Sequence, residues 1–200
     1  MKIHIFSTIF LFFISTTLTT ASNNTFKPTS NDTDFIRTSC QTTLYPQICF
    51  TSLSGYSSAI QQNPARLARV AIGVTLNKAK HMAKYVSNIS HSTDYANPRI
   101  AAAVHDCHEV FEDAADSIRG SLQQMRKLGG SGESLRFQLS NVQTWMSAAL
   151  TNEETCTDGF EDIPDNGVKA DVCGRAVKVK EVTSNALALV NGFANSIQTP

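Results

Sequence analysis

The 200-residue chain has no excess of charge of either sign, because 17 basic side chains are balanced by 17 acidic ones. Balanced charge gives no electrostatic reason to expect a nucleic acid or an anionic membrane as a partner. The sequence also lacks a glycine-rich phosphate loop, a dinucleotide fingerprint and the Gly-x-Ser-x-Gly turn of serine hydrolases. These absences favour a protein that is not an enzyme and that needs no cofactor.

One long apolar run is present, and it lies at the N-terminus. Residues 5–14 are almost continuously apolar, Lys2 precedes them, and small residues follow up to Ala21. The run is too short to span a bilayer as a permanent anchor, and no later run is long enough either. We therefore predict a signal peptide over residues 1–21 and a secreted, extracellular protein without a membrane anchor.

The rest of the chain fits an exported protein. Loss of Lys2 with the leader leaves 16 basic and 17 acidic side chains, a net charge near −1. Residues 22–32 are expected to form a flexible N-terminus, and residues 33–198 a single domain. Three Asn-x-Ser/Thr sequences are candidate acceptors of N-linked glycans: Asn23, Asn31 and Asn88.

Helix is the secondary structure expected throughout the domain, because no stretch alternates polar and apolar residues convincingly with period two. Asn63-Pro64 and Asn97-Pro98 predict two helix starts. An asparagine before the first turn accepts hydrogen bonds from its free amides, and a proline at the first helical position has no amide to leave unpaired.

Apolar residues recur three and four residues apart along four segments, which predicts an all-α, up-down-up-down four-helix bundle over residues 63–198. Residues 33–62 would precede it as a helical hairpin. The sequence Leu128-Gly129-Gly130 predicts the end of the second bundle helix. Core packing alone explains the apolar positions, which are Ile72, Leu76, Ala79, Ala83 and Val86; Ile100, Val104, Cys107, Phe111, Ala114, Ile118, Leu122 and Met125; Leu135, Leu139, Val142, Met146 and Ala149; and Val172, Ala176, Val179, Val182, Ala186, Leu189 or Val190, Phe193 and Ile197.

Two of the five cysteines are equally distant from a predicted turn. Cys107 precedes, and Cys156 follows, the turn between Ser131 and Gly132 by the same number of residues. Equal offsets place two residues at the same height in an antiparallel helical hairpin, so this pair can come within disulfide reach. We predict a disulfide between the second and third bundle helices.

The remaining three cysteines form one further symmetric pair and one residue without a mate. Cys40 and Cys49 are symmetric about residues 44–46 and would close the N-terminal hairpin. Cys173 has no such mate and is the candidate free thiol. It continues an apolar stripe, so we expect a buried, inert thiol and a monomeric protein. The alternative is a redox site or an intermolecular disulfide that links a dimer.

Several ordered segments resemble plant invertase and pectin methylesterase inhibitors. The resemblance extends over about residues 33–197 and includes the five-cysteine framework. The segments are Phe35-Ile36-Arg37-Thr38-Ser39-Cys40 with Tyr45-Pro46 and Cys49; Asp106-Cys107-His108-Glu109 with Asp113-Ala114-Ala115-Asp116; Trp145-Met146-Ser147-Ala148-Ala149-Leu150-Thr151 with Thr155-Cys156; and Thr183-Ser184-Asn185-Ala186-Leu187-Ala188-Leu189.

The resemblance implies the same bundle and hairpin, the same two disulfides, and an apoplastic inhibitor of a plant cell-wall enzyme. Invertase inhibitors of this family often carry a Pro-Lys-Phe tripeptide in a bundle loop. Here the nearest sequence is Phe26-Lys27-Pro28, before the hairpin. Residues 147–151 and 182–185 also look more like the methylesterase branch. We therefore expect pectin methylesterase as the partner, with acid invertase as the alternative.

The second bundle helix has five acids within residues 106–116 and no lysine or arginine among them. Helical spacing places Glu109, Asp113 and Asp116 on one stripe, opposite the apolar side. Taken alone, the stripe would be a solvated outer face. The resemblance implies instead that it lies over the esterase active-site cleft, in a 1:1 complex that blocks the substrate sterically. Further contact positions implied by the resemblance are Thr155 and Asp158.

Two other kinds of site were weighed. His105, Cys107 and His108 are close in sequence, but Cys107 faces the core and is assigned to a disulfide, so we expect no metal site. A secreted helical module with a structural role, or one that binds a small hydrophobic ligand, is the alternative of another class. A lipid binder would require a large apolar cavity, of which the regular stripes give no sign.

Overall fold

The computed structural model describes residues 30–92 and 97–198. The predicted signal peptide, Asn23 and the segment Phe26-Lys27-Pro28 lie outside the described residues. Within the described ranges all regular structure is helical, and no helix is long and apolar enough to cross a membrane. The elements in chain order are α1 (Ser30–Cys40), α2 (Pro46–Leu53), η1 (Ser54–Tyr56), α3 (Ser57–Ile60), α4 (Pro64–Ser92), α5 (Pro98–Arg126), α6 (Gly132–Asp158) and α7 (Gly167–Gln198).

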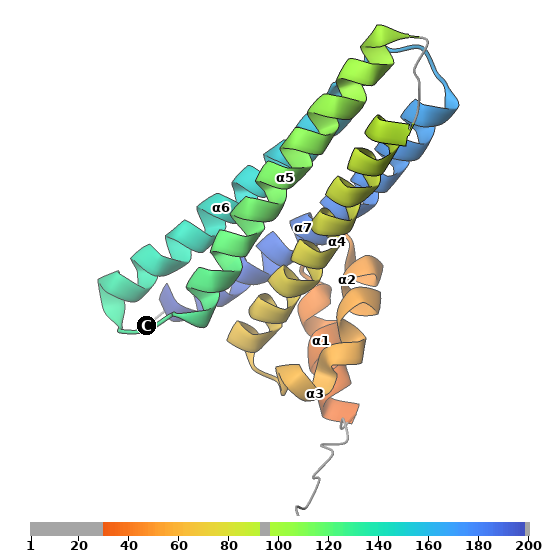
Figure 1. Ribbon diagram of the computed structural model, residues 1–200. Coiled ribbons are helices and arrows are strands. Elements are labelled where there is room, and N and C mark those ends of the chain that lie inside the picture. The colour runs from red at the N-terminus through yellow and green to blue at the C-terminus, as the bar shows by residue number, and fades with distance from the viewer. Residues whose placement is uncertain (1–29, 93–96, 199–200) are drawn as a thin grey trace, which may run out of the picture.

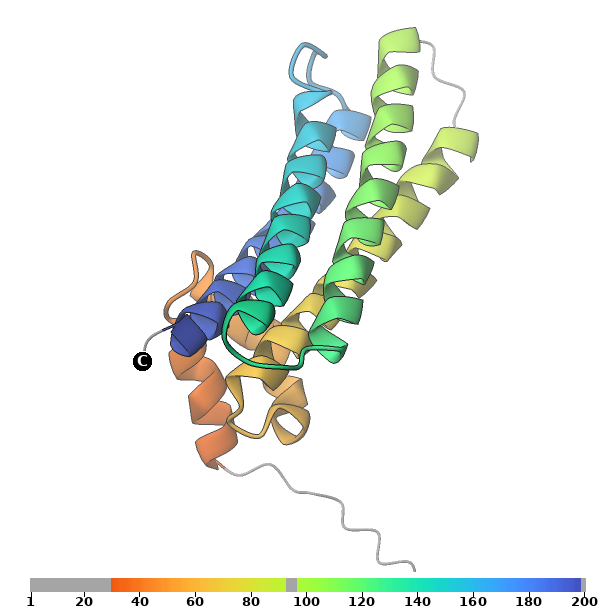
Figure 2. The same ribbon diagram turned by 90° about the vertical axis from the view of Figure 1, so that its left-hand side faces the viewer.

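The four long helices, α4 to α7, form the predicted up-down-up-down bundle (Figures 1 and 2). Each helix contacts the one before and after it in sequence, and α4 also contacts α7, which closes the bundle. The prediction of an all-α bundle behind a disulfide-closed hairpin is therefore confirmed.

Side-chain caps explain where the bundle helices begin. The Asn63 side chain accepts a hydrogen bond from the Arg66 amide, and the Asn97 side chain accepts one from the Arg99 amide, both at 2.9 Å. Asn166 caps α7 in the same way, accepting from the Lys169 amide at 3.0 Å. Two of these three caps were predicted. The sequence reasoning did not identify Asn166 as a cap.

The predicted stripes line the core. Phe111, Ile118, Val142 and Met146 are completely buried at its centre. Some stripe positions are only partly buried, and they include Leu76 in the middle of α4 as well as positions nearer the helix ends. The partly buried members of the stripes are Leu76, Ile100, Leu135, Phe193 and Ile197.

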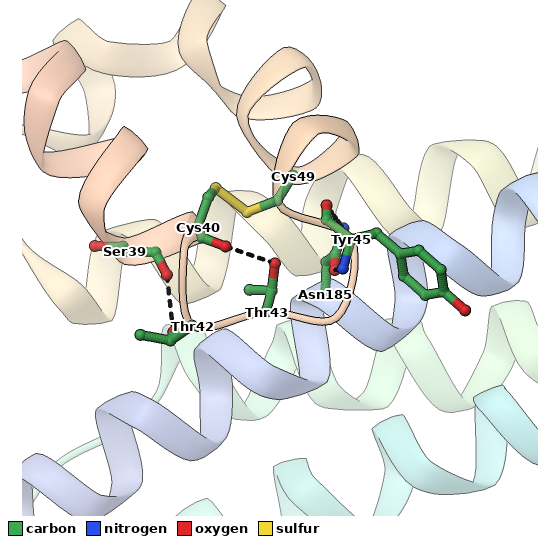
Figure 3. The surroundings of a disulfide bond; sticks show 7 residues. All are labelled: Ser39, Cys40, Thr42, Thr43, Tyr45, Cys49 and Asn185. Carbon is green, nitrogen blue, oxygen red and sulfur yellow. Dashed lines mark hydrogen bonds between the residues drawn. A yellow bond between two sulfur atoms is a disulfide. The ribbon is translucent and has the colours of Figure 1, made fainter.

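The N-terminal hairpin of α1 and α2 is closed by a disulfide between Cys40 and Cys49, whose Cα atoms are 5.6 Å apart. The buried Asn185 side chain attaches this hairpin to α7 (Figure 3). Its amide nitrogen donates to the Tyr45 carbonyl at 2.9 Å, and its oxygen accepts from the Tyr45 amide at 3.0 Å. One side chain thus satisfies both backbone groups of a loop residue. The segment predicted as the hairpin, residues 33–62, also contains two short helices that were not predicted separately, η1 and α3, which continue the chain towards α4.

Candidate partner-binding face

Four carboxylates on α5 form what we call the acidic face: Glu109, Glu112, Asp113 and Asp116. All four are exposed. On the same helix Cys107 and Phe111 are completely buried. The helical period therefore separates an apolar inner side from an acidic outer side.

The disulfide between Cys107 and Cys156 ties the acidic face to the last turn of α6, with Cα atoms 4.3 Å apart. Thr155 and Asp158 lie in that turn, and both are exposed. The Thr155 hydroxyl donates to the Thr151 carbonyl at 3.0 Å. Among the described residues, no hydrogen bond or ion pair joins Thr155 or Asp158 to the acidic face. The structure brings them to the same end of α5 as Glu109 through the disulfide and not through side-chain contact.

An open groove of about 600 Å³ runs between α4 and α5, along the acidic face. Ser87, Ser90 and His91 line it from α4. From α5, two histidines and three carboxylates line it: His105, His108, Glu109, Glu112 and Asp113.

Basic side chains lie close to three of the four carboxylates of the acidic face. His108 Nε2 lies 3.9 Å from Glu112 Oε1, and His105 Nδ1 lies 4.0 Å from Glu109 Oε2. Arg119 pairs with Asp116. This arginine lies three residues beyond the acidic segment, where the sequence reasoning did not look. Asp113 forms no ion pair with any described residue, so it is the carboxylate most available to a partner.

Within residues 30–92 and 97–198, His105, Asp106 and Glu109 form the group that comes nearest to a metal site. Their candidate ligand atoms lie within 4.8 Å of one another, and all three residues are exposed. A structural zinc site takes four protein ligands. Three exposed groups from adjacent turns of one helix therefore hold a metal less well than such a site.

An aromatic side chain beside the acidic face was not among the predicted site residues. Trp145 on α6 is 37% exposed. Its ring lies over Gly120 of α5, where an added Cβ would come within 3.4 Å of the ring. Gly120 lies four residues after Asp116, so the ring borders the acidic face. Trp145 is the single tryptophan in the chain, and aromatic residues are enriched in protein interfaces.

The other predicted residues do not line the groove between α4 and α5. Cys173 is the free cysteine and is half-buried, less covered than expected. Burial raises the pKa of its thiol, which keeps it protonated. Asn31 on α1 and Asn88 on α4 are exposed.

A buried carboxyl group on α6 was also missed. The Glu153 side chain is completely buried. Its Oε1 lies 2.8 Å from the Thr183 hydroxyl on α7, while Oε2 has no hydrogen-bond partner. Burial raises its pKa from 4.5 to about 8. The sequence signal was its position on the apolar stripe, four residues after Ala149 and three before Cys156.

The described residues include a small apolar cavity beneath the hairpin. It lies between α2, α4 and α7 and has a volume of about 10 Å³. Sites for small hydrophobic ligands have volumes of several hundred Å³. This cavity is too small to support the lipid-binding alternative.

Known proteins share both the sequence and the fold. Residues 34–189 match the family model described as plant invertase/pectin methylesterase inhibitor. Pectinesterase inhibitor 11 of Arabidopsis thaliana is 40% identical over 97% of this chain and 98% of its own. A 21 kDa protein of Daucus carota is 43% identical over 80% of this chain and 83% of its own. The crystal structure of a mutant pectin methylesterase inhibitor from Arabidopsis superposes with a TM-score of 0.62 at 22% identity, covering 78% of this chain and 95% of that one.

Proposed function

This chain belongs to the plant invertase/pectin methylesterase inhibitor family, and we propose that it is secreted into the cell wall, where it inhibits pectin methylesterase. The observation that carries the proposal is the 40% identity to a pectinesterase inhibitor over nearly the full length of both chains. Its relatives are named as inhibitors, and the chain is not an enzyme.

We infer that inhibition is steric and that one bundle binds one esterase molecule. The acidic face would lie across the cleft that admits pectin, with Asp113 pairing to a basic or polar group at its rim. Thr155, Asp158 and Trp145 would extend the contact onto α6. Two disulfides and a packed core support the idea, because a rigid surface loses little conformational entropy on binding.

Exposed carboxylates of this kind contribute mainly to association rate and specificity. Inhibition is therefore expected to weaken as salt is raised from 0.05 to 0.5 M, since screening shortens the range of charge attraction. An association rate that does not change with salt would place the interface away from the acidic face.

The test of the partner is a parallel titration of purified protein against a plant pectin methylesterase and an acid invertase at acidic pH. The proposal predicts inhibition of the esterase and a 1:1 complex by light scattering. Inhibition of invertase alone would refute it. Acid invertase is included in the experiment because the family also contains invertase inhibitors.

The test of the face is Asp113→Lys, with Glu133→Lys as the matched control. Both acids are exposed, but Glu133 lies in the first turn of α6, at the opposite end of that helix from Asp158. Reversing the charge of Asp113 is expected to weaken inhibition about tenfold or more, which corresponds to about 1.4 kcal/mol. Equal potency of the two variants, with native helical circular dichroism, would move the interface elsewhere.

A further inference from the structure

We propose that the groove between α4 and α7 binds de-esterified pectin, a polymer with a carboxylate on each sugar unit. The inference rests on the proposed function, because pectin methylesterase generates those carboxylates from methyl esters. It concerns a different surface from the acidic face.

The groove has a volume of about 280 Å³, near the lower limit of small-ligand sites. The two helices that form its walls are neighbours in the bundle (Figure 1). Lys78, His81 and Tyr85 line it from α4, and Arg175 and Lys178 line it from α7. No carboxylate is among its lining residues.

The arginine in this groove is already engaged. Arg175 Nε donates to Asp171 Oδ1 at 2.9 Å, and its guanidinium lies 4.2 Å from the centre of the Tyr85 ring. The Tyr85 hydroxyl donates to the same aspartate. These contacts fix the tyrosine ring at the groove wall.

The two lysines that line the groove form no such ion pair with a carboxylate in the described part of the chain. Lys78 and Lys178 are exposed, and neither forms an ion pair within 4 Å with any carboxylate among the described residues. They approach the groove from opposite walls. Two ammonium groups that form no ion pair within 4 Å with a described residue, on opposite walls of a groove with a fixed aromatic ring, suit a ligand that carries repeated carboxylates on sugar rings.

Charge distinguishes this groove from the acidic face. A polyuronate is repelled by the carboxylates of α5 and attracted to the α4–α7 groove, so the polymer and the esterase would use different surfaces. The inhibitor could then remain on pectin that the esterase has already processed. Methyl esterification removes the carboxylate charge and would abolish the attraction.

The experiment measures binding of the full-length protein to polygalacturonate by affinity electrophoresis at low salt. Fully methyl-esterified pectin and polyglutamate serve as comparison polymers. The test variant is Lys78→Gln/Lys178→Gln. Its matched control is Lys80→Gln/Lys127→Gln, which removes the same charge from exposed lysines outside the groove. Esterase inhibition is measured on all proteins in parallel.

We expect wild type and control to bind polygalacturonate alike, and the test variant to bind about fivefold to tenfold more weakly, as fits the loss of two exposed ion pairs. Equal loss in both variants, no binding by the wild type, or equal binding to esterified pectin or polyglutamate would overturn the proposal. Inhibition should be unchanged in the test variant. Loss of polymer binding with full inhibition supports this proposal, whereas polymer binding without any inhibition would refute the proposed function alone.

Discussion

Glu153 makes the stability of this protein depend on pH, and Glu153→Gln should remove that dependence. In the folded protein the pKa of this buried carboxyl is raised to about 8, from 4.5. Between these values the folded state holds a proton that the unfolded chain has released. The free energy of unfolding therefore falls as pH rises, by about 1.4 kcal/mol per pH unit from this group.

The geometry around Glu153 agrees with a neutral side chain. The Thr183 hydroxyl lies 2.8 Å from Glu153 Oε1 and 3.2 Å from the Val179 carbonyl, but it has one proton to donate. If that proton goes to Val179, a protonated Glu153 can donate to the Thr183 oxygen. The amide of a glutamine can donate in the same way, so the substitution retains the hydrogen bond.

The size of the effect follows from the pH. The stabilising contribution of Glu153 is complete below pH 4.5 and is progressively lost as pH rises towards 8. At pH 7 the wild type should have lost about 3 kcal/mol relative to pH 4.5, and Glu153→Gln should have retained it. At pH 4.5 the two proteins should have similar stability. The acidic conditions of the proposed cell-wall location would keep the native bundle near its most stable state.

The assay is denaturant unfolding followed by circular dichroism, from pH 4.5 to pH 8, with disulfides intact. Glu161→Gln is the control, because Glu161 is exposed and its substitution should leave the slope unchanged. Parallel profiles for wild type and Glu153→Gln would refute the reasoning. They would mean that Glu153 ionises in the folded protein without a penalty.

Two further predictions concern the covalent and polar links between elements. Replacing Cys107 and Cys156 by serine opens a loop with a sequence separation of 49 and should lower the free energy of unfolding by about 4 kcal/mol, against about 3 kcal/mol for the separation of 9 at Cys40 and Cys49; equal losses in denaturant unfolding would contradict this order. Asn185→Leu leaves both backbone groups of the loop residue that it binds unpaired and should cost about 2 kcal/mol. Faster hydrogen exchange at the Tyr45 amide is the expected sign, and unchanged protection would mean that other contacts hold the hairpin.

The positions of the bundle helices could be predicted because their signals are local. Asn63 and Asn97 cap their own first turns, and the apolar stripes follow the helical period. The symmetry of Cys107 and Cys156 about one turn is also contained in the chain order. Predicting these features required no knowledge of how the helices pack.

The contacts made by individual residues of the acidic face could be established only from the structure. Sequence spacing placed Glu109, Asp113 and Asp116 on one exposed stripe, but only the structure shows that Arg119 engages Asp116 and leaves Asp113 without an ion pair. The position of the Trp145 ring over Gly120 depends on how closely α5 and α6 approach. No rule of local periodicity sets that distance.

The sequence by itself determined the helices, their caps, the two cysteine pairs and the family, because each depends on residue order or on neighbours within a few turns. The tertiary structure alone decided the link between Tyr45 and Asn185, which are 140 residues apart, and the burial of Glu153 against Thr183. It also decided that lysines of α4 and α7 share one groove. Such contacts depend on how side chains of different helices interdigitate, and therefore on the packing of the whole bundle.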